Sequence, residues 1–233
     1  MKMKDNNNKE IDLYKKPERK RLLDVDGSFM TFMTKAGELI VLTLAWMVSL
    51  IPVVTVIGAT TSLYYALVKN LRRSRGYPLT EYWASFKRVL VNGIIISVIT
   101  GVWCFALYKL FTSTFAMTDE QRAPLVRVYT VLITLTVGVL VYIPPVLSRF
   151  PVSAGACIRL AMVMAFRYIH ITTVLIASIA GITALYIYML PLPTIVFVPG
   201  LWWLGASWLI EYVLHKYMPE PTEENKDEWY YEL

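Results

Sequence analysis

The chain has 233 residues, of which 56% are hydrophobic and 17% are charged, and its mean hydropathy is +0.50. Soluble domains carry about a quarter charged residues, so this composition excludes an ordinary soluble domain and indicates an integral membrane protein. The formal charge of +6 does not predict nucleic-acid binding, because most Lys and Arg residues lie beside apolar runs. Two cysteines in separate segments predict neither a disulfide framework nor a metal site.

The first apolar run, residues 39–68, follows a polar arm over residues 1–27 and contains thirty residues without a charged side chain. As a single helix the run would be about 45 Å long, against a hydrocarbon core of about 30 Å. A hairpin folded between Pro52 and Gly58 instead leaves the basic clusters on both sides of the run in the cytoplasm, and the positive-inside rule favours it. The arms are short, so one of them could be re-entrant rather than fully spanning.

The rest of the chain alternates amphipathic stretches with apolar runs. Residues 76–92 and 152–167 predict amphipathic helices on the inner membrane surface. The Pro144-Pro145 pair is expected to end or kink its helix, and residues 215–233 predict an acidic cytoplasmic tail. Four later runs are apolar enough to span a bilayer: 93–110, 125–146, 170–190 and 194–214.

These elements predict an all-α integral membrane protein with five to six transmembrane helices, a broken first hairpin and inner-face amphipathic helices. The membrane domain covers residues 28–214. With both termini placed in the cytoplasm, 20 of the 23 Lys and Arg residues lie inside and three lie outside. This asymmetry predicts a multi-pass protein of the bacterial cytoplasmic membrane with both termini cytoplasmic.

An internal repeat is suggested by aligning residues 86–101 with residues 166–181. The alignment pairs Phe86 with Phe166, and further matches are Lys87 with Arg167, Ile96 with Ile176, Ile99 with Ile179, and Gly101 with Gly181. It predicts a parallel repeat of residues 58–113 and 125–190, in which each half has an inward span, a basic surface helix and an outward span. The alternative is chance similarity between two Ile/Val-rich spans.

The sequence shows no constellation that predicts catalysis. It has no Walker A pattern, no paired histidines and no Gly-x-Ser-x-Gly. Glu38 and Glu211 are placed near the cytoplasmic ends of spans, where their carboxylates are expected to reach water. We therefore expect no enzyme activity, no catalytic residue, no metal and no cofactor.

Polar uncharged residues in the first hairpin form a candidate functional segment. One interpretation is helix packing through small side chains. The other is that the segment after the break starts a half-helix, whose free backbone N–H groups and positive dipole end face a ligand or a partner loop. The residues of this segment are Pro52, Thr55, Gly58, Thr60 and Thr61.

A second candidate surface is basic and lies on the predicted inner face. Each Lys or Arg there contributes about 1 kcal/mol of attraction to an anionic leaflet, so membrane anchoring is sufficient to explain the charges. Docking of a cytoplasmic partner is the alternative. The residues of this inner-face basic surface are Arg72, Arg73, Arg75, Phe86, Lys87 and Arg88.

Several short motifs between Ile51 and Asn92 occur in an order found in one family. They are Pro52-Val53-Val54-Thr55, Gly58-Ala59-Thr60-Thr61 followed by Tyr64-Tyr65, then Gly76-Tyr77, and Ser85-Phe86-Lys87. On these motifs the chain resembles the YesL family of bacterial membrane proteins, a domain of unknown function. It departs from the family pattern in one extra residue before Gly58, and in Val89, where the family has an Asn.

The YesL resemblance implies a setting of sugar uptake, since such proteins are often encoded beside carbohydrate ABC importers. It predicts a non-enzymatic accessory component of carbohydrate uptake or utilisation. Its partners would be the lipid bilayer and ABC-importer permease subunits, and not nucleic acid. The alternative is a small-solute transporter or channel that uses the broken hairpin over residues 39–68.

Overall fold

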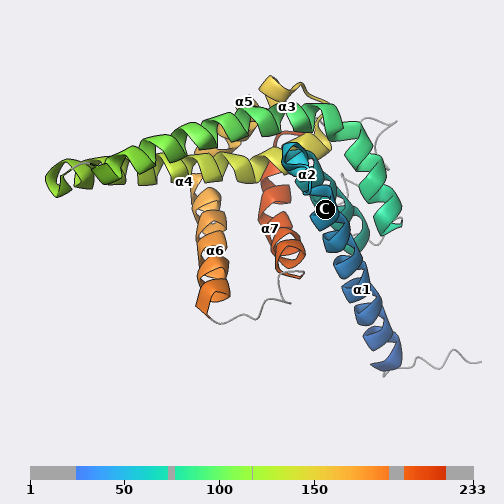
Figure 1. Cartoon of the computed structure of the whole chain (residues 1–233). Helices are drawn as coiled ribbons and strands as arrows, with labels where there is room; N and C mark the ends of the chain where they lie inside the picture. Colours follow the sequence, from blue (N-terminus) through green and yellow to red (C-terminus); the bar gives the residue numbers. More distant parts are fainter. Residues whose placement is uncertain (1–24, 73–76, 117, 189–196, 219–233) are drawn as a thin grey trace, which may run out of the picture. The chain divides into compact units, whose positions relative to one another are not determined.

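The computed structural model describes residues 25–72, 77–116, 118–188 and 197–218. This described part of the chain contains helices and no strand, as the sequence predicts (Figure 1). The chain divides into two units, Met1–Lys35 and Ala36–Leu233. The features described below lie in the second unit, apart from the first residues of α1.

The first apolar run is divided between two helices. Helix α1 covers Val25–Ser49 and helix α2 covers Val56–Ala66, with a short 3-10 turn, η2, at Val53–Thr55 between them. Pro52 has no N–H to donate, and the Thr55 hydroxyl donates to the carbonyl oxygens of Ser49 and Pro52, each at 2.6 Å. The predicted break near Pro52 is therefore confirmed, while the return of both arms to one face of a membrane stays a prediction.

After α2 the chain continues as a π-helical turn, η3, over Leu67–Arg72, and then as one long helix. Helix α3 runs without interruption over Pro78–Ser113, 36 residues, and joins the predicted surface helix to the predicted span. Pro78 suits the first turn because the missing N–H is not needed there. Gly93 alone does not end the helix, since one glycine costs only about 1 kcal/mol relative to alanine.

In the second half of the chain the helix breaks between the predicted surface helix and the next span, whereas in the first half α3 continues through the corresponding position. A 3-10 turn, η4, at Thr114–Ala116 is followed by α4 at Asp119–Arg149, which continues past the Pro144-Pro145 pair instead of ending there. The predicted amphipathic stretch forms α5, Ala154–Arg167. At Tyr168 the backbone leaves the helical region (ψ 46°), and α6 begins at the next residue, covering Ile169–Tyr188.

The last helix, α7, covers Val198–His215 and lies beside α6 (Figure 1). The Trp202 indole N–H donates to the Ser178 hydroxyl at 3.0 Å, which joins the two helices. The first turn of α7 also packs closely on α1, because a Cβ built on Gly200 would lie 2.8 Å from Thr43 Oγ1. Helix α7 is thus held between α1 and α6.

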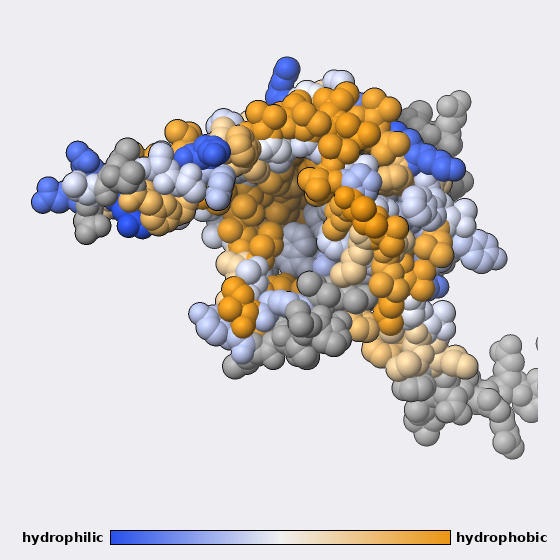
Figure 2. All heavy atoms as spheres, viewed as in Figure 1, coloured by the Kyte–Doolittle hydropathy of each residue, from blue (hydrophilic) through white to orange (hydrophobic). Residues whose placement is uncertain are grey.

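Four helices of the described residues are long and apolar enough to cross a membrane, which makes the chain a membrane-embedded, multi-pass protein. Figure 2 shows hydrophilic residues gathered where α3 ends and α4 begins, with apolar residues along the helices beside them. Helices α2 and α7 are not among the four, so the count of five to six spans stays a prediction. The four segments are Met30–Ser49, Pro78–Ser113, Glu120–Arg149 and Ile169–Tyr188.

Helix α2 packs on α3 through a close contact between two glycines. A Cβ built on Gly93 would lie only 2.8 Å from the Cα of Gly58, so the backbones touch at this point. Beside the contact, the Ile57 N–H donates to the Ser97 hydroxyl at 3.1 Å, which satisfies an N–H in the first turn of α2. The contact therefore fixes both the distance and the register of α2 against α3.

The free thiol of Cys157 is fully buried on α5, 3.8 Å from the carbonyl oxygen of Ile143. Burial raises its pKa to about 12, so at pH 8 only about one thiol in ten thousand is a thiolate. In a Cys104→Ala variant, we expect N-ethylmaleimide to leave the folded protein unmodified and to add one equivalent after denaturation. Intact-mass spectrometry measures this, and full modification of the folded protein would contradict the packing of α5.

Candidate functional site

A buried ion pair joins the C-terminal end of α4 to α7. Arg149 Nη2 lies 2.6 Å from Glu211 Oε1, and the two side chains are 1% and 5% exposed. The Tyr64 hydroxyl of α2 donates to the same carboxylate oxygen at 2.7 Å. Three helices far apart in the sequence therefore meet at one carboxylate, which we call the Glu211 cluster (Tyr64, Arg149 and Glu211).

The expectation that the Glu211 carboxylate reaches water was wrong. The carboxylate does not reach water from the end of a span, because α7 packs against α2 and α4 and encloses it. The sequence did carry a signal, since Glu211 is a single acidic residue among the apolar residues of α7. An ionisable residue in such a helix usually faces the protein interior and has a partner. The identity of that partner could not be predicted, because Arg149 and Tyr64 are 62 and 147 residues away.

Arg72 extends the contact between the first half of the chain and α7. Its Nη1 donates to the carbonyl oxygen of Ser207 at 3.3 Å, and its guanidinium lies 4.3 Å from the centre of the Trp208 ring. This stacking is a cation–π contact that contributes about 0.5–2 kcal/mol. Arg72 therefore packs on α7 within the chain.

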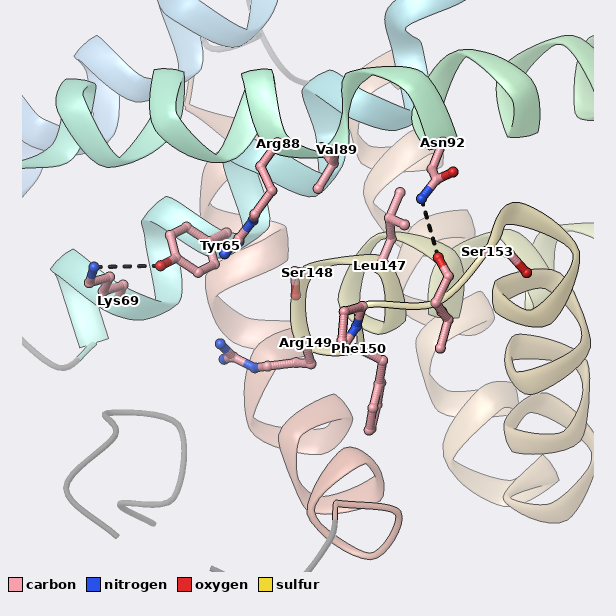
Figure 3. A pocket seen from close by; sticks show the side chains of 12 residues that line it. Tyr65, Lys69, Arg88, Val89, Asn92, Leu147, Ser148, Arg149, Phe150 and Ser153 are labelled. Atoms are coloured by element: carbon pink, nitrogen blue, oxygen red, sulfur yellow. Dashed lines mark hydrogen bonds between the residues drawn. The ribbon is translucent and has the colours of Figure 1, made fainter. Parts of the chain in front are cut away.

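A cavity of about 780 Å³ lies next to the Glu211 cluster, between η3, α3 and the end of α4 (Figure 3). Three cations from three different elements line it: Lys69, Arg88 and Arg149. Further lining comes from the segment that connects α4 to α5, including Phe150 and Ser153. The Arg149 side chain is only 1% exposed and is directed at Glu211, so Arg149 borders the cavity mainly through its backbone.

The cations of the cavity are held by neighbouring groups. Lys69 lies 2.7 Å from Glu81 and donates to the Tyr65 hydroxyl at 3.5 Å. Partial burial lowers the pKa of Lys69, but the hydrogen bond to Glu81 and the nearby Tyr65 outweigh it, so the pKa lies above its usual value. Arg88 reaches from α3 towards Tyr65, with its guanidinium 5.0 Å from the ring centre (Figure 3). These contacts hold Lys69 as a cation and set Arg88 over an aromatic ring.

The polar groups of the cavity suit an anion. Asn92 donates through Nδ2 to the carbonyl oxygen of Val152 at 3.2 Å and holds the α4–α5 connection against α3. Ser148 and Ser153 also line the cavity, and the Ser148 hydroxyl donates to the carbonyl oxygen of Pro145. Among the described lining residues there is no carboxylate, although Glu81 and Glu211 behind the lining pair with Lys69 and Arg149. Guanidinium and ammonium groups with hydroxyl donors are the usual partners of phosphate and carboxylate groups.

The candidate segment of the first hairpin is engaged in packing and backbone hydrogen bonds. Thr60 and Thr61 donate to carbonyl oxygens four residues earlier, at 2.7 Å each, and Thr60 also accepts from the Trp46 indole. Gly58 contacts Gly93, and Thr55 is buried at the turn, whereas Pro52 is exposed. None of these five lines the described cavity.

The inner-face basic surface is only partly gathered into one place. Phe86 is half-buried and stacks on Tyr82, while Lys87 and Arg88 are exposed on α3. Arg88 lines the cavity; Arg72 packs on α7. Arg73 and Arg75 lie outside the described residues. The sequence-based set thus contains one cavity residue, Arg88, and lacks Lys69, Arg149 and the other members of the Glu211 cluster.

Comparison with known proteins finds one family model that matches part of the chain. Residues 39–111 match the family described as a protein of unknown function, DUF624. No curated protein and no solved structure matches the chain. The DUF624 region includes α2 and α3 and contributes Tyr64, Lys69 and Arg88, whereas Arg149 and Glu211 lie beyond it. The site is therefore completed by residues outside the DUF624 region.

Metal binding finds no support in the part of the chain that the structure describes. No group of three or more His, Cys, Asp or Glu side chains there could hold a metal ion. The chemistry available to the described site is that of guanidinium, ammonium, amide and hydroxyl groups, with the paired carboxylate of Glu211.

Proposed function

We propose that the protein is a non-enzymatic component of the bacterial cytoplasmic membrane that binds an anionic ligand in the cavity beside the Glu211 cluster. The observation that carries this proposal is the meeting of Lys69, Arg88 and Arg149 around one cavity of about 780 Å³. A cavity of this size accommodates a small organic molecule. Binding rather than catalysis is favoured because the described lining offers cations, an amide and hydroxyls, without a carboxylate or histidine as a general base.

The proposal is tested by ligand binding with two neighbouring substitutions on α3. Arg88→Gln removes a lining cation, and Lys87→Gln removes an exposed cation that does not line the cavity. Inorganic phosphate and a sugar phosphate are expected to raise the thermal unfolding temperature of the purified protein, and the matching neutral sugar is not. A charged hydrogen bond contributes about 1.5–3 kcal/mol, so Arg88→Gln should weaken binding roughly tenfold or more.

The Lys87→Gln protein should bind like the unmodified protein. Equal loss of binding in both variants would show that only overall charge matters. No anion-dependent stabilisation in the unmodified protein would reject the proposal.

The biological setting that we propose is carbohydrate uptake or utilisation, with the protein as an accessory of ABC-importer permease subunits. The YesL resemblance supports this setting, and the exposed cation Lys87 on α3 offers a contact for a partner. Co-purification with permease subunits in mild detergent is the expected result. Isolation of the protein alone, together with unchanged sugar uptake after deletion, would count against an accessory role.

A small-solute transporter is the second candidate, and the internal repeat favours it. Extending the sequence alignment without gaps pairs Gly58 with Gly138 and Lys69 with Arg149. Both glycines lie at close helix contacts, since a Cβ on Gly138 would lie 3.0 Å from Thr172, and both cations line the cavity. Transport sites commonly lie between such repeats. Solute flux in proteoliposomes that contain only this protein would establish this function, and no flux across a panel of anionic and neutral solutes would reject it.

Five to six spans, with both termini cytoplasmic, remain our proposed topology. It places Lys69, Arg88 and Arg149, and hence the cavity, at the cytoplasmic side. Reporter fusions that are active only in the cytoplasm are expected to be active at both ends of the chain. An active periplasmic reporter at either end would overturn this orientation.

A further inference from the structure

An apolar groove of about 350 Å³ lies between α3, α4 and α5. It is lined by Ile99, Trp103, Leu135, Leu140 and Met162, among others. Two of the polar groups in its wall are bonded to one another, because the Trp103 indole donates to the Thr136 hydroxyl at 3.1 Å. Thr136 in turn donates to the carbonyl oxygen of Leu132 at 2.8 Å. The groove therefore offers a hydrocarbon surface.

The groove begins close to where the cationic cavity ends. On α4, Leu147 lines the cavity and Ile143 lines the groove, one helical turn apart. On α3, Asn92 lines the cavity and Ile99 the groove, about two turns apart. A positively charged cavity and an apolar groove thus follow one another along the same pair of helices.

The length of the groove matches one half of a bilayer. Its residues on α4 run from Leu132 to Ile143, which is about 16 Å of helix. Half of a hydrocarbon core of about 30 Å is of the same length. Helices α3 and α4 are both long and apolar enough to cross the membrane, so the groove faces the region of the acyl chains.

We infer that the cavity and the groove together bind one anionic glycerophospholipid of the inner leaflet. The phosphate group lies in the cavity near Lys69 and Arg88, and an acyl chain lies in the groove against Trp103 and Leu135. Charge complementarity selects an anionic headgroup over a zwitterionic one. This inference rests on the proposed anion site and names the molecule that supplies the anion.

The test uses the purified full-length chain in neutral detergent, with bound lipid counted by native mass spectrometry. Phosphatidylglycerol is compared with phosphatidylcholine of the same acyl chains, and inorganic phosphate is added as a competitor. Leu135→Trp fills the groove, and Val131→Trp places the same side chain one turn away on α4, outside the groove. Arg88→Gln and Lys87→Gln form the matching pair at the headgroup.

The expected result is one phosphatidylglycerol per chain, bound at least tenfold more tightly than phosphatidylcholine, because the choline cation of phosphatidylcholine is repelled by the lining cations. Leu135→Trp and Arg88→Gln should each weaken phosphatidylglycerol binding by a similar factor. Val131→Trp and Lys87→Gln should leave phosphatidylglycerol binding unchanged. Equal binding of the two lipids, or no effect of Leu135→Trp, would overturn the inference.

The phosphate and lipid measurements together distinguish this inference from the proposed function. If phosphate binds and Arg88→Gln abolishes it, but phosphatidylglycerol shows no preference, the ligand is a soluble anion and the lipid assignment fails. If neither phosphate nor phosphatidylglycerol binds, both proposals fail. If Leu135→Trp changes the oligomeric state and not lipid binding, the groove packs another copy of the chain and the lipid assignment fails.

Discussion

Glu211→Gln is expected to lower the free energy of unfolding by about 3–5 kcal/mol. Gln still accepts the hydrogen bond from Tyr64, but it removes the negative charge 2.6 Å from a guanidinium that is 1% exposed. A buried charge that loses its partner carries its full desolvation cost, which is several kcal/mol in protein interiors. Unfolding of the purified protein, followed by heat or denaturant, measures the loss.

The matched control for the charge is Glu120→Gln, because Glu120 is an exposed carboxylate at the start of α4. It should change stability by less than about 0.5 kcal/mol. Tyr64→Phe should have an intermediate cost of about 1 kcal/mol, since it removes one hydrogen bond and leaves the ion pair. Equal stability of the Glu211→Gln and Glu120→Gln proteins would contradict the buried pair.

A double substitution tests whether Arg149 and Glu211 stabilise the protein as an ion pair or as two independent residues. Arg149→Met together with Glu211→Leu replaces both charges by apolar side chains of similar size. The double variant should lose less stability than either single charge removal, because neither side then leaves a buried charge without its partner. Additive losses would show that the two residues act independently.

Gly93→Ala is expected to cost about 1–3 kcal/mol of stability, the usual range for overpacking. The added Cβ would lie 2.8 Å from Gly58 Cα and 2.9 Å from Gly58 N, and these are backbone atoms that cannot rotate away. Helix α2 must move off α3, which also strains the hydrogen bond from Ile57 N–H to Ser97. Thermal unfolding in detergent, by intrinsic tryptophan fluorescence, measures the change.

Gly101→Ala is the control for this substitution. Gly101 lies on the same helix, and a Cβ there meets nothing within 4 Å. Because alanine favours helix over glycine by about 0.8–1.0 kcal/mol, Gly101→Ala should be neutral or slightly stabilising. If Gly101→Ala destabilises the protein as much as Gly93→Ala does, the loss of stability comes from α3 alone. The close contact between α2 and α3 would then be rejected as the cause.

The helical membrane class, the break near Pro52 and the amphipathic helix α5 could be predicted from local patterns. Each depends on residues close together in the chain, such as the missing N–H of Pro52 or the spacing of apolar residues in α5. The end of a helix was harder to predict. The polar residues before Gly93 suggested a separate surface helix, yet nothing in that stretch breaks the backbone, so α3 continues.

The candidate site could be predicted only in part, since its residues come from distant segments. Arg88 was selected for its charge, but a charge pattern cannot distinguish a cavity cation from an anchoring one such as Lys87. Burial of Glu211 depends on the packing of α7 against α2 and α4, and that packing has no local signature. Long-range side-chain pairs of this kind depend on how the helices pack, and local sequence patterns do not specify that packing.

The uninterrupted α3 gives the two halves of the chain different mechanical properties. Arg88, beside the cavity, and Ser113, at the far end, belong to one rod of 36 residues, about 54 Å long. In the second half, the break at Tyr168 places a joint between α5 and α6. The first half of the chain thus has one continuous helix where the second half has two helices joined at Tyr168, and residues of both halves line the cavity.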